Sequence, residues 1–93
     1  MANGIDNPVP IKIGMAVSLT GRYALLGRQV AAGAQCYVDE TNAAGGIVFG
    51  DDQPRRPVEL TVYDDESRGG ECERRVRGLI EEVGVDLLLG PYG

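Results

Sequence analysis

Three segments of this 93-residue chain carry residue types that bind or transform small molecules. The segment SLTGRYALLG, at residues 18–27, has a glycine-containing turn just before an apolar run of helical spacing. The triplet Asp64, Asp65 and Glu66 follows a second apolar run, and GPYG occupies residues 90–93. A helix N-terminus after a glycine turn binds carboxylates, and neighbouring carboxylates can bind a cation. Because acidic residues are common in turns, we expect the triplet to be a solvated turn and not a metal site.

The elements that position these segments follow from hydrophobic periodicity. Residues 11–17 (IKIGMAV) are apolar apart from one lysine and predict a buried strand. Apolar residues then recur at helical spacing and predict an amphipathic helix over residues 24–43. Gly45 and Gly46 follow this run, and glycine at that place ends a helix without strain.

A second helix and two further strands are expected in the remainder of the chain. The β-branched, alternating segment VELTVY predicts a strand at residues 58–63. The next apolar positions predict a helix over residues 68–82, with Ser67 as its N-cap and Gly84 as its stop. The short apolar run at residues 85–89 predicts a third strand, of the kind that is buried in parallel sheets.

The order β-α-β-α-β predicts a three-layer α/β fold with a parallel sheet. Crossovers between parallel strands are right-handed, and if the second one passes back over the first strand, the strand order becomes 2-1-3 and the two helices cover opposite faces. Cys36 and Cys72 would lie in different helices, so we expect two buried free thiols and no disulfide.

Composition excludes several classes of function. The formal net charge of −5 argues against nucleic acid and against anionic membrane surfaces as partners. The chain has no histidine and no Cys-x-x-Cys, so we expect no metal site and no cofactor. No apolar run is long enough to span a bilayer. Residues 1–10 lack the basic head and apolar core of a signal peptide, and we expect them to be an N-terminal extension.

In such a sheet, ligands bind where the strand order reverses, which here brings residues 18–27 and 90–93 together. Dinucleotide binding does not fit, because only Gly21 and Gly27 occur where G-x-G-x-x-G is needed. A phospho-acceptor receiver does not fit either, since Ser18 and Gly90 stand where carboxylates would be required.

The third alternative is small-molecule binding by a hinged receptor. The helix that begins after Gly21 would offer free backbone N–H groups to a carboxylate, and Gly21 would let the backbone approach it closely. Leu26 and Tyr92 would supply apolar walls.

The sequence resembles the start of type I periplasmic binding proteins, and within them the branched-chain amino-acid receptors of ABC importers. The resemblance covers residues 11–93. Its most specific parts are the SLTG turn, the helix end ETNAAGGI at residues 40–47, the turn DDES at residues 64–67 and the final GPYG.

The resemblance implies a non-enzymatic receptor with two α/β lobes that bind an amino acid between them, of which residues 11–93 would form part of the N-terminal lobe. It implies an extracytoplasmic or periplasmic location, including a lipoprotein form, and an ABC permease as partner. The alternative is a regulatory receptor of the same fold that senses amides or small acids. The expected ligand-binding residues are Thr20, Gly21, Tyr23, Leu26, Tyr92 and Gly93.

Within this family Leu26 stands where a bulky aromatic often lines the pocket, and Tyr92 and Gly93 lie on the loop that approaches the ligand carboxylate. Without the rest of the lobe, the strand from Val85 to Leu89 would be an open apolar edge. We therefore expect the chain by itself to self-associate through this edge.

Overall fold

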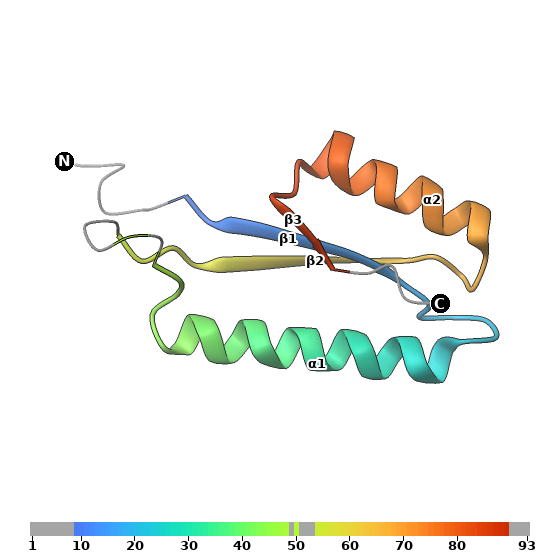
Figure 1. Cartoon of the computed structure of the whole chain (residues 1–93). Coiled ribbons are helices and arrows are strands. Elements are labelled where there is room, and N and C mark those ends of the chain that lie inside the picture. Colours follow the sequence, from blue (N-terminus) through green and yellow to red (C-terminus); the bar gives the residue numbers. More distant parts are fainter. Residues whose placement is uncertain (1–8, 49, 51–53, 90–93) are drawn as a thin grey trace.

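Figure 1 shows the computed structural model of the chain, of which residues 9–48, 50 and 54–89 are described. Within these residues three strands form one parallel sheet, and α1 and α2 cover its opposite faces (Figure 1). In chain order the elements are β1 (Ile11–Val17), α1 (Ala24–Ala43), β2 (Val58–Asp64), α2 (Gly69–Gly78), the π-helical turn η1 (Leu79–Val83) and β3 (Leu87–Leu89). The strand order β2-β1-β3 confirms the predicted three-layer α/β fold.

β1 is the central strand and contributes much of the core. Six of its seven residues are buried, and only Lys12 is half-buried. It pairs with β2 along its whole length, so that Val17 lies opposite Asp64, and its middle pairs with β3. Helices cover both faces of β1, which explains why its sequence is continuously apolar and does not alternate.

α1 has the predicted bounds, and the other elements hold its C-terminal end. Gly45 and Gly46 follow it with φ angles of 106° and 96°, which confirms the predicted glycine stop. In the last turn, the Asn42 side chain donates to the carbonyl oxygen of Val58 and accepts from its N–H, both at 2.8 Å. One turn before Asn42, Val38 packs in a core cluster with residues from the start of β1 and β2.

The second helix differs from the prediction at both ends. It begins at Gly69, and the predicted N-cap, Ser67, lies outside it because its φ of 59° is in the left-handed region. At the other end α2 passes into η1, where the Leu79 carbonyl accepts the N–H of Gly84 at 3.0 Å. Gly84 ends the helix as predicted, with φ of 72°. The wider π-turn accommodates one extra residue, and Leu79 is fully buried beside Gly14, where a Cβ would lie 3.0 Å from its side chain.

β3 is shorter and more exposed than predicted. It spans Leu87–Leu89, and just before it the Asp86 N–H donates to the Lys12 carbonyl oxygen (2.7 Å) while the Asp86 carboxylate accepts the Lys12 N–H (2.9 Å). The expectation of a buried strand is wrong, since Leu87 is 54% exposed and its two neighbours are exposed as well. Among the described residues no strand pairs with the outer edge of β3, so the leucines form an apolar edge.

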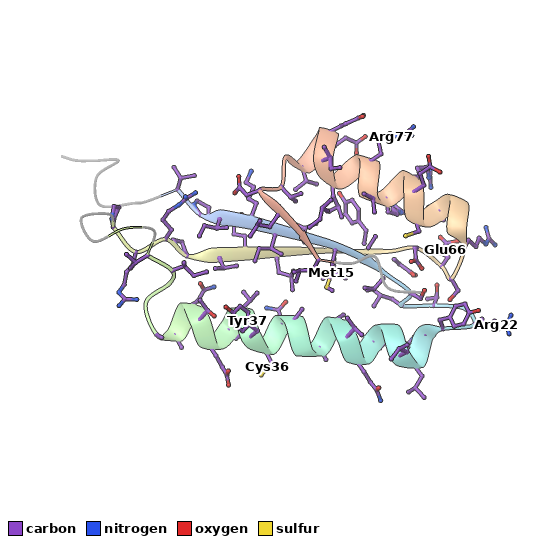
Figure 2. All side chains as sticks on the ribbon, viewed as in Figure 1. Met15, Arg22, Cys36, Tyr37, Glu66 and Arg77 are labelled. Atoms are coloured by element: carbon purple, nitrogen blue, oxygen red, sulfur yellow. The ribbon has the colours of Figure 1, made fainter. Side chains whose placement is uncertain are left out.

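The two cysteines are free, as predicted, but the expected burial of both is wrong. Cys36 is exposed, and in Figure 2 it points from α1 away from the sheet. Cys72 is half-buried in α2. No helix in the described part of the chain has the length and apolar character needed to cross a membrane.

Candidate functional site

The loop between β1 and α1 (residues 18–23) and the turn between β2 and α2 (residues 65–68) meet at the carboxyl end of the sheet. The two segments begin side by side, because β1 and β2 are parallel and their last residues, Val17 and Asp64, are paired. Figure 2 shows Arg22 of the β1–α1 loop and Glu66 of the β2–α2 turn at the same end of the molecule. This is the edge of an open α/β sheet at which ligands bind.

Asp64, the last residue of β2, is a hydrogen-bond acceptor for both segments. Its Oδ1 accepts the N–H groups of Leu19 (2.9 Å), Thr20 (3.3 Å) and Glu66 (2.8 Å), and its Oδ2 accepts the Thr20 hydroxyl at 2.7 Å. Burial acts to raise the pKa of Asp64, but these hydrogen bonds outweigh it and lower the pKa from 3.8 to about 2. The carboxylate is therefore ionised at neutral pH and already engaged within the protein.

Asp65 is buried, with only 4% of its surface exposed. Its Oδ1 accepts the Ser18 hydroxyl at 2.7 Å and the N–H of Ser67 at 2.9 Å. The prediction of a solvated acidic turn is therefore wrong for Asp64 and Asp65, because the β1–α1 loop supplies their hydrogen-bond donors. It holds for Glu66, which is exposed.

Neither a metal site nor a reactive thiol is found around these carboxylates. The described residues contain no group of three or more His, Cys, Asp or Glu side chains placed to hold a metal ion. Burial raises the pKa of the Cys72 thiol, and the charge of Asp65 and a hydrogen bond to it raise this pKa further. The thiol is therefore protonated at neutral pH, when it is a poor nucleophile.

Ser67 contacts the β1–α1 loop and not the helix that follows it. Its Oγ donates to the carbonyl oxygen of Thr20 at 2.8 Å and accepts the N–H of Tyr23 at 2.9 Å. Tyr23 is the N-cap residue of α1 and makes no side-chain cap hydrogen bond of its own. This role could not be predicted from the sequence, because the partners lie 44 and 47 residues apart and no local pattern marks such a pair.

Two glycines allow the close packing of these segments. Gly21 has φ of 86°, and a Cβ there would lie 2.9 Å from both the Glu66 carbonyl oxygen and the Ser67 Oγ. Gly27 is buried in the first turns of α1, where a Cβ would lie 1.7 Å from the carbonyl oxygen of Ser18. The expected close approach at Gly21 is therefore made by the β2–α2 turn.

The predicted ligand-binding residues that the structure describes lie together at the start of α1. Thr20 and Gly21 are exposed in the loop, Tyr23 is 49% exposed and Leu26 is 59% exposed. The Arg22 guanidinium lies over the Tyr23 ring, 5.4 Å from its centre. The other two predicted residues, Tyr92 and Gly93, lie outside the described residues.

The expectation of free N–H groups at the start of α1 needs correction. The Tyr23 N–H is bonded to Ser67, and the Ala24 N–H donates to the Gly21 carbonyl oxygen at 3.2 Å. Two of the donors that were expected to receive a carboxylate are thus occupied within the protein. Tyr23 and Leu26 leave apolar surface exposed at this edge, which suits contact with an apolar group.

The fold and this edge define an α/β lobe of the kind that carries a ligand site at the carboxyl ends of its strands. The sequence model of the periplasmic binding proteins matches residues 10–93. The chain therefore belongs to the periplasmic binding protein family.

Individual relatives and a solved structure agree with this family. The chain is 37% identical over 82 residues to "Leu/Ile/Val-binding protein homolog 8" of Brucella abortus and, to the same extent, of Brucella suis. That match covers 88% of this chain and 19% of the relatives. The structure of the branched-chain amino acid transporter substrate binding protein LivJ from Streptococcus pneumoniae, in complex with isoleucine, superposes with a TM-score of 0.79 at 34% identity. It covers 88% of this chain, which itself spans 22% of that protein.

Proposed function

We propose that this chain forms part of the N-terminal lobe of a two-lobe receptor that binds an amino acid, with branched-chain amino acids as the first candidates. Residues 11–93 would belong to the lobe, and residues 1–10 would precede it. The observation that carries the proposal is the likeness to the Streptococcus pneumoniae protein, whose structure was solved with isoleucine. That protein has the same fold over the aligned region and is 34% identical to this chain.

The ligand would lie against the start of α1, with the second lobe closing from the opposite side. The proposed ligand-binding residues are Thr20, Gly21, Tyr23, Leu26, Tyr92 and Gly93. The exposure of Tyr23 and Leu26 at the carboxyl edge of the sheet supports this choice, because a pocket for an apolar side chain needs such a wall. Thr20 would contribute mainly through its backbone, since its hydroxyl is bonded to Asp64.

The receptor would bind and release its ligand without catalysing a reaction. It would act outside the cytoplasm, as a free periplasmic protein or as a lipoprotein, and would deliver its ligand to an ABC permease. The family is one of binding proteins, which supports this proposal.

Ligand screening of the two-lobe receptor tests the proposal. We expect a rise in melting temperature with one or more branched-chain amino acids, because a ligand that binds only the folded state stabilises it. No rise with any amino acid would refute the importer function. A rise with short amides or small acids alone would instead favour a regulatory receptor of the same fold.

A pair of substitutions at neighbouring positions tests where the ligand lies. Leu26→Trp should change the affinity for isoleucine by roughly 1–3 kcal/mol, because it alters the size of the pocket. Leu25→Trp is the matched control, since Leu25 is the adjacent and still more exposed leucine. Equal effects of the two substitutions, measured by titration calorimetry, would contradict the proposed position of the ligand.

We further propose that the 93-residue chain on its own self-associates through the β3 edge. The exposure of Leu87, Leu88 and Leu89 supports this, because an open, apolar edge strand offers unpaired backbone groups to a second strand.

A further inference from the structure

The turn that carries Ser67 is held in an unfavourable backbone conformation. Glu66 and Ser67 have φ angles of 56° and 59°, a region that residues with a Cβ rarely adopt. The two preceding carboxylates fix this turn, since Asp64 accepts the N–H of Glu66 at 2.8 Å and Asp65 accepts the N–H of Ser67 at 2.9 Å. Strain of this kind persists where the surroundings over-determine it, which is typical of functional positions.

The strained turn delivers one hydroxyl to two backbone groups of the β1–α1 loop. The Ser67 Oγ binds the Thr20 carbonyl oxygen and the Tyr23 N–H, on either side of Gly21. Tyr23 has no cap of its own, so Ser67 satisfies a helix-terminal N–H from outside the helix. On the other side of the loop, the Arg28 Nε donates to the Leu19 carbonyl oxygen at 2.8 Å.

We propose that Ser67 is a positioning residue for ligand binding, because it caps α1 from the neighbouring turn and so fixes the start of the helix. This inference rests on the proposed function, in which Tyr23 and Leu26 face the ligand. If the start of α1 is already fixed in the free receptor, ligand binding does not have to order Tyr23 and Leu26. The smaller loss of conformational entropy on binding then raises the affinity. Loss of the hydroxyl should therefore weaken isoleucine binding roughly tenfold or more.

Two glycine substitutions in adjacent positions separate the hydroxyl from the backbone strain. Ser67→Gly and Glu66→Gly each relieve one left-handed φ angle, but only Ser67→Gly removes the hydroxyl. Glu66→Gly keeps the backbone N–H that Asp64 accepts and loses an exposed carboxylate, which pairs with Arg68 at 3.7 Å and interacts electrostatically with Arg74. Ser67→Ala removes the hydroxyl and keeps the strain, so it serves as a second variant if Ser67→Gly does not fold.

The first measurement is the affinity of the two-lobe receptor and its variants for isoleucine, by titration calorimetry. We expect Ser67→Gly and Ser67→Ala to bind roughly tenfold or more weakly, and Glu66→Gly to stay within about twofold of the parent. An unchanged affinity in the Ser67 variants, or an equal loss in Glu66→Gly, would overturn the proposal.

The second measurement is amide hydrogen exchange over residues 19–26 in the 93-residue chain itself. We expect the Tyr23 amide to exchange faster in Ser67→Gly than in Glu66→Gly, because only the former loses the acceptor of that N–H. Weaker binding without faster exchange would overturn the proposal in favour of direct contact between Ser67 and the ligand. If the parent binds no amino acid, the proposed function fails, and exchange alone then decides whether Ser67 caps α1.

Discussion

Gly27 and Gly33 lie in the same helix, and the structure predicts opposite effects when each is replaced by alanine. A Cβ at Gly27 would lie 1.7 Å from the carbonyl oxygen of Ser18 and 2.6 Å from its carbonyl carbon, whereas nothing lies within 4 Å of one at Gly33. The start of α1 would have to move well over an ångström away from the loop to admit the methyl group at Gly27. That movement would also lengthen the hydrogen bond from the Arg28 Nε to the Leu19 carbonyl oxygen, now 2.8 Å.

The magnitudes follow from two terms of opposite sign. Replacing glycine by alanine inside a helix favours folding by about 1 kcal/mol, and this term applies at both positions. Overpacking costs about 1–3 kcal/mol, and rigid backbone as the neighbour puts Gly27→Ala at the upper end or beyond. We therefore expect Gly33→Ala to raise the free energy of unfolding by about 0.5–1 kcal/mol and Gly27→Ala to lower it by about 2 kcal/mol.

Urea unfolding followed by far-ultraviolet circular dichroism measures this difference. The chain contains no tryptophan, so the helical signal is the convenient probe. Each variant should be unfolded at two protein concentrations, so that the proposed self-association is separated from folding. Equal stability of the two variants would refute the packing of α1 on the β1–α1 loop.

Three further predictions concern other contacts. Because folding lowers the pKa of Asp64 from 3.8 to about 2, its contribution to stability is present above pH 3.8 and is lost as the pH falls through 2. Asp64→Asn should thus reduce the stability difference between pH 6 and pH 2.5, measured by urea unfolding, by about 1 kcal/mol, since solvent screens this group and part of its contribution remains at pH 2.5. An unchanged difference would contradict this. Asn42→Ala should lower the free energy of unfolding by about 1–2 kcal/mol, since it removes both hydrogen bonds to Val58. Gln35→Ala, at an exposed position of the same helix, is the control, and a smaller loss of stability in Asn42→Ala than in this control would contradict the prediction. Leu88→Lys should reduce the mass measured by light scattering, because a charge on an edge strand disfavours pairing; an unchanged mass would place association elsewhere.

The elements and their order could be predicted from the sequence because they depend on local patterns. Residues 11–17 and 24–43 were predicted with the bounds that the structure has, since apolar periodicity and the glycines at 45 and 46 mark them directly. The strand order β2-β1-β3 is the one expected if the second right-handed crossover passes back over the first strand, and the structure has this order.

Local patterns were least informative where burial depends on neighbours. Cys36 and the leucines of β3 have the composition of buried residues, yet they are exposed, because the described residues leave much of their surface uncovered. The π-helical turn at Leu79 was not predicted either, since it reflects packing of that side chain against Gly14 in a distant strand.

The candidate site shows the same division. Local sequence patterns place a turn and a helix start beyond β1, and an acidic turn beyond β2, at the same edge of the sheet. What those side chains do depends on contacts between the two loops: Asp64 and Asp65 accept hydrogen bonds from the β1–α1 loop, and the Ser67 hydroxyl accepts the Tyr23 N–H at the start of α1. These contacts join residues 44 to 47 positions apart, and they exist because the parallel pairing of Val17 with Asp64 brings the two loops together.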